Sequence, residues 1–267
     1  MVVFPQAKIN LGLHVLFKRE DGFHEIETCF YPVPLTDVLE AVPAESFRFS
    51  QTGLEIPGSG DSNLCVRAYE LLKKEFNISP VHIHLHKIIP MGAGLGGGSS
   101  NGAWMLKLLN ELFSLGLDPT ELMSFASELG SDCPFFINGT PAIGTGTGAT
   151  LSPVETDLGG TYIRIIHPGI HVSTADAYAS LTPNNDRPPL QGLLQQPVLS
   201  WKEILVNDFC PSIYKRHPRI GEIENELYQQ GAYYACMSGS GSAVFGLFDH
   251  EPPGANSDGF IWTGKLS

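Results

Sequence analysis

The sequence lacks the features that mark membrane proteins, secreted proteins and nucleic-acid-binding proteins. It has no run of about 18 apolar residues, the length that a membrane-spanning helix needs, and its start lacks the basic segment and cleavage site of a signal peptide. Basic residues are scarce, 16 against 28 acidic ones, so the net charge of −12 leaves no broad basic face for nucleic acid. We therefore expect a soluble, cytoplasmic protein without nucleic-acid or membrane partners.

The sequence also lacks any pairing pattern among its cysteines. They are odd in number, scattered along the chain, and none forms a Cys-x-x-Cys pair. This distribution favours reduced thiols over a disulfide framework or a zinc site. The five residues are Cys29, Cys65, Cys133, Cys210 and Cys236.

Apolar residues make up 42% of the 267 positions, enough for one large domain or two medium ones. Their periodicity alternates between strand and helix spacing, which predicts an α+β chain. A break at Leu158-Gly159-Gly160 predicts domains at 1–157 and 158–267. We expect strands at 7–17, 25–42 (broken by Pro32 and Pro34), 81–87, 161–169, 232–237, 243–248 and near Trp262, helices at 64–76, 99–113, 118–130, 172–181 and 218–231, and a loop leading into a hairpin at 131–154.

The first predicted strand, "AKINLGLHVLF", alternates regularly. Lys8, Asn10 and His14 fall on one side, and apolar residues including Phe17 fall on the other. Such a pattern normally describes a strand with one side in the core and one side in water.

The stretch "PMGAGLGGGSSNGAW", residues 90–104, predicts an anion site. Glycine occupies five of the seven positions from 92 to 98, more than a turn requires. Glycine lets the backbone adopt positive φ, and a glycine loop that opens a helix points unpaired N–H groups at one place, where the helix dipole favours an anion. Ser99, Ser100 and Asn101 would add side-chain donors from the first helical turn.

Two familiar phosphate loops do not fit this stretch. Residues 92–97 formally match G-x-G-x-x-G, so a dinucleotide fold is an alternative. However, the preceding strand "VHIHLH" alternates instead of being continuously apolar, and a second helix follows the first. The chain also lacks the Gly-Lys-Ser/Thr of a P-loop and the H-R-D and D-F-G of protein kinases. The loop is therefore a phosphate loop of another kind.

Other polar residues have ordinary explanations beside functional ones. Lys8 fits a solvated strand lysine, Asp132 a helix or turn cap, and His24 a histidine beside the Asp-Gly turn in "DGFHE". The histidines of 82–86 have metal-like spacing, which a wet strand face explains more simply. The Gly-Ser stretch 238–242 fits a hairpin turn or a second ligand-facing loop. The residues alone leave these alternatives open.

In this order, the segments resemble the GHMP small-molecule kinases. The matching stretches span residues 5 to about 246: "PQAKINLGLHV", "KREDGFHEIETCF", "DSNLCVRAYELL", "PMGAGLGGGSSN", "GSDCPFFINGTPAIGTGTG", "VSTADAY", the "ND" at 207–208 and "MSGSGSAVFG". The resemblance implies a two-domain α+β fold, with an N-terminal half like ribosomal protein S5 domain 2 and a ferredoxin-like C-terminal half. The pair "AKINLGL" and "DGFHE" is similar to the branch that phosphorylates a cytidine-diphosphate-linked methylerythritol in non-mevalonate isoprenoid biosynthesis.

The resemblance implies a role for each matched position. Lys8 and Asp132 would flank the acceptor hydroxyl, with Asp132 as general base, and Asn10 would orient the methylerythritol. Phe23, His24 and Tyr178 would frame the cytosine, and Ser240 would close on the substrate. ATP would bind to Asn63, Pro90, Met91, Gly92, Ala93, Gly94, Leu95, Gly96, Gly97, Gly98, Ser99, Ser100 and Asn101.

Some positions depart from the usual pattern. Phe23 replaces a tyrosine, and Gly102 and Cys133 replace alanine and valine. Gly97 and Gly98 stand where many members carry serines, so the ligands of Mg²⁺ stay unassigned and ATP and water are expected to hold the ion. Alternatives are a homoserine or mevalonate type of kinase and a non-catalytic nucleotide- or RNA-binding module. A monomer or a homodimer is expected.

Overall fold

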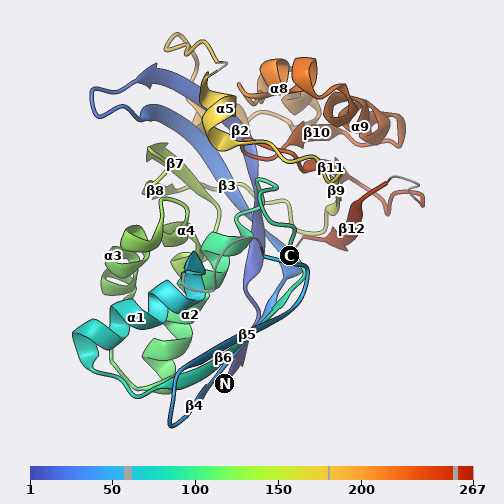
Figure 1. Cartoon of the computed structure of the whole chain (residues 1–267). Coiled ribbons are helices and arrows are strands. Elements are labelled where there is room, and N and C mark those ends of the chain that lie inside the picture. Colours follow the sequence, from blue (N-terminus) through green and yellow to red (C-terminus); the bar gives the residue numbers. More distant parts are fainter. Residues whose placement is uncertain (57–61, 180, 255–257, 267) are drawn as a thin grey trace. The chain divides into compact units, whose positions relative to one another are not determined.

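The computed structural model describes residues 1–56, 62–179, 181–254 and 258–266 (Figure 1). The chain forms two compact units, and neither unit is one continuous stretch. The first unit contains residues 1–7, 35–91 and 96–140, and the second contains residues 8–34, 92–95 and 141–267. The predicted domain boundary at 157/158 stays a prediction.

A four-stranded sheet and four helices build the first unit. The strand order is β1-β4-β6-β5, with β4 antiparallel and β5 parallel to β6. Helices α1 and α2 pack against each other, and α2 also contacts α3 and α4 (Figure 1). The strands are β1 (Val2–Val3), β4 (Val38–Pro43), β5 (Arg48–Gly53) and β6 (Val81–Lys87), and the helices are α1 (Leu64–Phe76), α2 (Gly97–Leu112), α3 (Pro119–Leu129) and α4 (Cys133–Asn138).

The alternation predicted for β6 is confirmed. Val81, Ile83 and Leu85 are buried, whereas the histidines between and after them face the other side. Hydrogen bonds to the neighbouring β5 explain these histidines: Ser50 Oγ lies 2.9 Å from His84 Nδ1, and Thr52 Oγ1 lies 2.9 Å from Nδ1 of His86. The wet strand face is therefore the better interpretation of "VHIHLH".

Helix starts follow local capping chemistry, with one correction. The sequence "DPTELM" predicts a capping box of Asp118 and Glu121 at the start of α3, and the structure confirms it: Asp118 accepts from the backbone N–H of Thr120 and Glu121. For α1 the sequence predicts Asp61 or Ser62 as the cap. Asp61 lies outside the described residues, and the cap is Asn63, whose Oδ1 accepts from Cys65 N–H at 2.9 Å.

Helix α4 lies where the sequence predicted a loop. Its six residues, "CPFFIN", are too few to show helical periodicity. Five of the six are buried, so packing inside the first unit stabilises this short helix.

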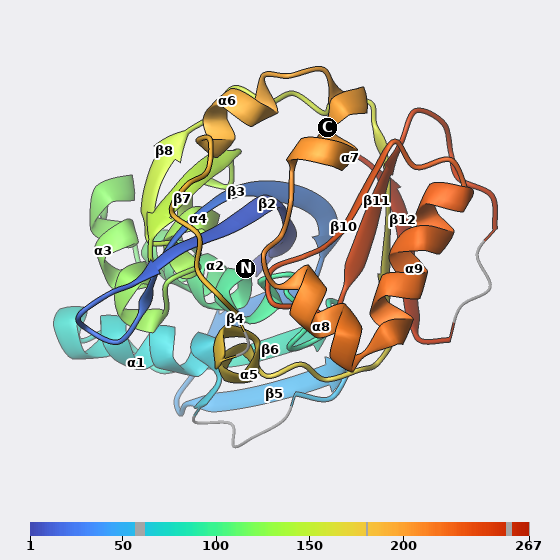
Figure 2. The same ribbon diagram turned by 90° about the horizontal axis from the view of Figure 1, so that it is seen from above.

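Two four-stranded antiparallel sheets and short helices build the second unit. Their orders are β2-β3-β7-β8 and β10-β11-β9-β12, and α8 and α9 lie along the second sheet (Figure 2). The strands are β2 (Gln6–Lys18), β3 (His24–Thr36), β7 (Ala142–Gly146), β8 (Thr150–Pro153), β9 (Tyr162–His167), β10 (Tyr234–Met237), β11 (Val244–Phe248) and β12 (Phe260–Lys265). The helices are α5 (Thr174–Ala179), α6 (Leu190–Leu194), η2 (Val198–Ser200), α7 (Trp201–Ile204), α8 (Cys210–Arg216) and α9 (Pro218–Gln229).

One apolar core joins the helices of this unit to its second sheet. Ile213 of α8 and Ile220, Ile223 and Leu227 of α9 pack with strand residues such as Met237. The sequence predicted α5, α9 and strands β9 to β12. It left residues 182–216 unassigned, and α6, η2, α7 and α8 lie there. Within the described residues, no helix is long and apolar enough to cross a membrane.

Two expectations about the N-terminal strands are wrong. Strand β3 runs through Pro32 and Pro34 instead of breaking there, because β7 pairs only with residues 26–30 and needs no N–H from the prolines. The polar side of β2 does not face water: Lys8 is 3%, Asn10 2% and His14 1% exposed.

Other segments of the second unit cover this polar side of β2. A Cβ on Gly12, which lies on the same side, would be 2.8 Å from Leu190 Cδ2, and Ser238 Oγ lies 3.4 Å from Asn10 Oδ1. At the far end of β2 the prediction fails in the opposite direction, because Phe17 was expected in the core and is 46% exposed. Alternation therefore located the strand and misassigned which of its sides meet water.

The buried imidazole ring of His14 makes the free energy of unfolding depend on pH in the acid range. Neither ring nitrogen has a hydrogen-bond partner among the described residues, and Nδ1 lies 3.8 Å from Glu27 Oε2. Burial, aided by the charge of Arg187, lowers the pKa of His14 from 6.5 to about 4. Between these values the unfolded chain binds a proton that the folded chain does not, so the free energy of unfolding falls as the pH falls.

We predict that His14→Leu weakens this dependence. The wild-type chain should lose about 2 kcal/mol more stability than the variant between about pH 7 and about pH 4.5, as the proton linkage requires. Urea unfolding at a series of pH values measures the difference. An equal loss in both proteins would show that His14 titrates normally in the folded state.

Candidate active site

The first unit contains the start of helix α2 and the second half of the glycine loop. Gly96 is the N-cap in the left-handed region, with φ of 69°, and no side chain caps the helix there. No side chain therefore competes with an anion for the first-turn N–H groups at this cap, and the anion site stays a prediction. Ser100 in this turn is fully buried, and among the described residues its Oγ has no hydrogen-bond partner.

A buried polar network lies beneath this helix start. Asp37 accepts four hydrogen bonds: from Lys87 Nζ at 2.5 Å, Asn101 Nδ2 at 2.8 Å, Ile88 N–H at 2.7 Å and Ile89 N–H at 2.9 Å. Lys87 Nζ also donates to Asn101 Oδ1 at 2.9 Å. Burial lowers the pKa of Lys87, and the contact with Asp37 opposes this effect. The network ties the end of β6 to the first turn of α2.

This network corrects the expectation for Asn101. The side chain was expected to add a donor for phosphate, but both its polar atoms bond inside the network. Asn101 therefore acts on the loop by holding α2 in place. The sequence offered one signal for the network, a lysine at the end of an alternating strand, and no signal for its partner Asp37.

The network also explains one of the two glycines that replace serines. A Cβ on Gly97 would lie 2.8 Å from Lys87 Nζ and 2.9 Å from Ile89 Cγ2. A Cβ on Gly98 would meet only Met91 Cε, at 3.7 Å. Gly97 is therefore required by packing, whereas Gly98 has room for a side chain.

The pair Gly97→Ala and Gly98→Ala tests this difference. Gly97→Ala should lower the free energy of unfolding by about 1–3 kcal/mol, because Lys87 is held by Asp37 and cannot move aside. Gly98→Ala should be neutral or stabilising by up to about 1 kcal/mol, since alanine favours helix over glycine. Urea unfolding measures both. Equal effects of the two substitutions would contradict the packing role of Gly97.

Asp132 also lies in the first unit. It occupies the N-cap position of α4, but its side chain makes no capping hydrogen bond. The capping role that was the simple explanation of Asp132 is therefore not realised. Among the other predicted residues of this unit, Pro90 is buried, Met91 is half-buried and Asn63 caps α1.

In the second unit, Lys8 and Asn10 form a buried polar pair on β2. Lys8 Nζ donates to Asn10 Oδ1 at 2.6 Å and lies 5.2 Å from the centre of the Phe30 ring. Asn10 Nδ2 donates to Thr28 Oγ1 at 2.8 Å, and Thr28 donates to Gly12 O at 2.7 Å. The amide of Asn10 is thus fixed in orientation, and it presents its oxygen to the ammonium group.

Both glycine-rich stretches reach this pair. Lys8 N–H donates to Leu95 O at 3.0 Å, and Ser238 Oγ donates to Gly94 O at 2.8 Å. A Cβ on Gly94 would lie 1.9 Å from Ser238 O, so only glycine allows the two stretches to approach this closely. Residues 92–95 and 238–242, far apart in sequence, are neighbours within one unit.

Asn207 supports the second Gly-Ser stretch. Its Nδ2 donates to Met237 O and to Gly239 O, both at 2.8 Å. The predicted residue Ser240 is the central residue of this stretch, and its Oγ lies 3.1 Å from Thr174 Oγ1. The stretch is therefore a supported loop and more than a bare hairpin turn.

The predicted cytosine residues partly come together. The rings of His24 and Tyr178 stack with centroids 4.6 Å apart and planes 20° from parallel, which leaves no room for a third ring between them. Phe23 is 63% exposed. Burial, with the charge of Lys18, lowers the pKa of His24, so its ring is neutral at neutral pH and offers one donor and one acceptor.

Comparison with known proteins identifies the class of this fold and site. The family model described as "GHMP kinases N terminal domain" matches residues 63–140, and "GHMP kinases C terminal" matches residues 191–256. A mevalonate kinase structure from Methanococcus jannaschii has a TM-score of 0.73 at 13% identity and covers 100% of this chain and 98% of that one, a likeness that shows the fold alone. The protein has the two-domain α+β fold of the GHMP kinases.

Relatives of higher sequence identity narrow the assignment to one family within the GHMP kinases. A 4-diphosphocytidyl-2-C-methyl-D-erythritol kinase of Cytophaga hutchinsonii is 52% identical over 94% of both chains, and one of Parabacteroides distasonis is 48% identical over 100% of both. A crystal structure of 4-(cytidine 5'-diphospho)-2C-methyl-D-erythritol kinase matches with a TM-score of 0.83 at 32% identity, over 99% of this chain and 98% of that one. The chain belongs to the 4-diphosphocytidyl-2-C-methyl-D-erythritol kinase family of the GHMP kinases.

Proposed function

We propose that this protein transfers the γ-phosphoryl group of ATP to the 2-hydroxyl of 4-diphosphocytidyl-2-C-methyl-D-erythritol, giving the 2-phosphate and ADP. The observation that carries the proposal is full-length identity near 50% to relatives that bear this kinase name. The reaction belongs to non-mevalonate isoprenoid precursor biosynthesis, which fits a cytoplasmic enzyme with a small-molecule substrate. A monomer or a homodimer remains the expected assembly.

ATP would bind along residues 90–101. Support comes from the start of α2, where no side chain caps the helix, and from the left-handed Gly92, Gly94 and Gly96, with φ of 63°, 78° and 69°. Phosphoryl transfer needs mainly positioning and neutralisation of charge. The Asp37 network, which holds the first turn of α2 through Asn101, suits the positioning.

The residues of the loop fit a Mg²⁺ ion that ATP brings with it. Mg²⁺ prefers oxygen ligands and keeps several waters and phosphate oxygens. Gly97 and Gly98 offer no ligand atom, whereas the buried Ser100 Oγ has no other partner among the described residues and would take part in holding the ion. When bound, the ion neutralises charge on the phosphates.

Asp132 would accept the proton of the acceptor hydroxyl. An alcohol is a poor nucleophile at neutral pH, so a carboxylate that takes its proton assists the attack. Lys8 would stabilise negative charge on the reacting oxygens, and Asn10, fixed by Thr28, would orient Lys8 and the methylerythritol.

His24, Tyr178 and Phe23 would bind the cytosine. A neutral histidine supplies one donor and one acceptor, which suits the mixed donor and acceptor edge of cytosine. Because His24 and Tyr178 already stack on each other, the base would lie against this pair and beside the exposed ring of Phe23. Ser240, on the supported loop, would close on the substrate.

A coupled assay of ADP release tests the proposed acceptor. The panel is 4-diphosphocytidyl-2-C-methyl-D-erythritol, methylerythritol without the cytidyl group, mevalonate and homoserine. We expect ADP only with the first alcohol. Comparable rates with mevalonate or homoserine would move the protein to another branch of the GHMP kinases. RNA binding with a steep salt dependence and no ADP release would instead indicate a binding module.

Asp132→Asn tests the proposed base. We expect kcat to fall by about 10²–10⁴-fold, the usual contribution of general base catalysis, while KM for ATP stays near its wild-type value. Asp118→Asn is the matched control, because it also removes a carboxylate from the first unit and keeps a good helix cap. Wild-type turnover in Asp132→Asn would remove this residue from the chemistry.

A further inference from the structure

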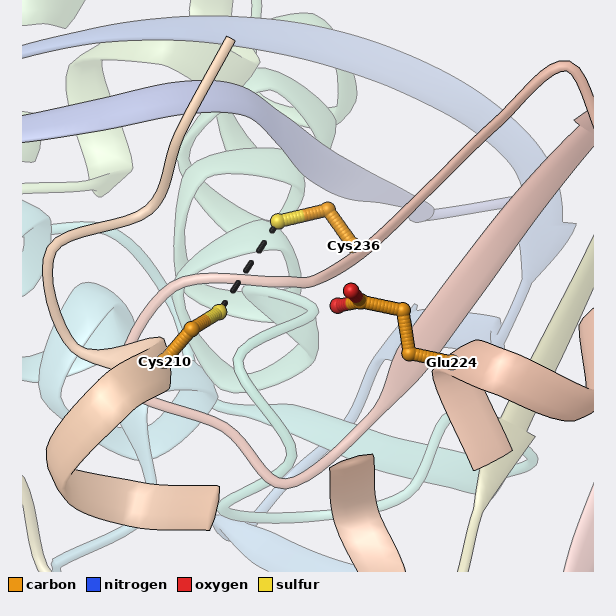
Figure 3. A group of neighbouring side chains, drawn as sticks. All are labelled: Cys210, Glu224 and Cys236. Atoms are coloured by element: carbon orange, nitrogen blue, oxygen red, sulfur yellow. Dashed lines mark hydrogen bonds between the residues drawn. The ribbon is translucent and has the colours of Figure 1, made fainter. Parts of the chain in front are cut away.

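Two cysteines and a glutamate converge in the second unit, in a region that the proposed reaction does not use (Figure 3). Cys210 is the first residue of α8, Glu224 lies on α9 and Cys236 lies on β10. Their sulfur and carboxylate oxygen atoms lie within 4.8 Å of one another. Figure 3 shows the three side chains pointing toward a common centre.

The distances suit a tetrahedral metal ion. Two thiolates bound at about 2.3 Å to a tetrahedral zinc ion lie about 3.8 Å apart. The Sγ atoms of Cys210 and Cys236 lie 3.9 Å apart. The pair therefore needs little movement to chelate an ion, and Glu224 is placed to supply a third ligand.

Hydrogen bonds hold the three side chains of the cluster together. Cys210 Sγ–H donates to Tyr214 OH at 3.2 Å, and Tyr214 OH donates to Glu224 Oε2. These contacts, together with the contact between the two thiols, keep two sulfur atoms and a carboxylate close to one centre.

The three residues are held by the packing of the second unit. Cys236 is buried in β10, whereas Cys210 and Glu224 are partly exposed. The ligands come from three elements that pack on one apolar core, so their positions are held by the fold.

We propose that Cys210, Cys236 and Glu224 bind one zinc ion, a borderline-soft cation that thiolates favour. The two thiol protons leave to the solvent as the ion binds, and no electrons are exchanged. Tyr214 OH or a water molecule takes the fourth position. The site joins α8, α9 and β10, so bound zinc stabilises the second unit.

Metal titration tests this proposal. The chain is purified with a reductant, stripped with a chelator and titrated with Zn²⁺ against a chromogenic chelator, and Co²⁺ is used to detect thiolate ligation by absorption. We expect one tight site per chain. Cys210→Ser, Cys236→Ser and Glu224→Gln should each weaken it by at least about tenfold, as loss of a ligand requires. Thermal unfolding of the wild-type chain should shift upward with zinc.

Controls separate this site from other metal ligands. Cys29→Ala removes a buried strand cysteine outside the cluster and should keep wild-type affinity, and circular dichroism checks that each variant is folded. His82→Gln with His86→Gln should also leave the tight site intact. Loss of binding in that double variant, or no stoichiometric binding in the wild type, would overturn the proposal. Free thiols are also counted in the denatured chain without reduction. Three free thiols instead of five would indicate a disulfide between Cys210 and Cys236, and that result would also overturn the proposal.

Discussion

Asp37 is the residue on which the ordered start of helix α2 depends. Desolvation of a carboxylate and an ammonium costs several kcal/mol for each ion, and only good geometry with further hydrogen bonds offsets this cost. Asp37 meets that condition because two backbone N–H groups, an amide and the Lys87 ammonium all donate to it. The network thereby fixes the chain before the loop, at residues 87–89, and the chain after it, at Asn101.

This constraint changes the interpretation of the glycine-rich stretch. Its glycines were first explained by positive φ and by a close approach of phosphate. Gly96 fits that explanation, but Gly97 has helical backbone and is required by the Lys87 ammonium beside it. Gly94 has a third reason, the approach of the Ser238 carbonyl. Glycines in one run thus meet different requirements, some of backbone conformation and some of packing. The sequence of the run alone does not show which requirement applies at which position.

The sequence predicted the elements whose signals are local. Alternation located β2 and β6, and capping chemistry located α3, because these patterns depend on residues a few positions apart. It failed where tertiary packing decides: α4 is too short to show a period, and the polar side of β2 is buried under Leu190 and Ser238. For the site, the loop and Lys8 were found from motifs, and Thr28 and Asn207 lie in matched stretches without an assigned role. Asp37 lies in no matched stretch, and it acts through Lys87, 50 residues away along the chain.

The cysteines also show how little spacing along the chain says about contacts in space. Spacing along the chain argued against a metal site, because Cys210, Glu224 and Cys236 form no short motif. A metal site needs ligands that are close in space, and the packing of α8 and α9 on β10 supplies that closeness. Spacing rules detect sites built within one loop or hairpin. They do not detect ligands that separate elements bring together, so the absence of a motif was never strong reason to assign these thiols to inert packing.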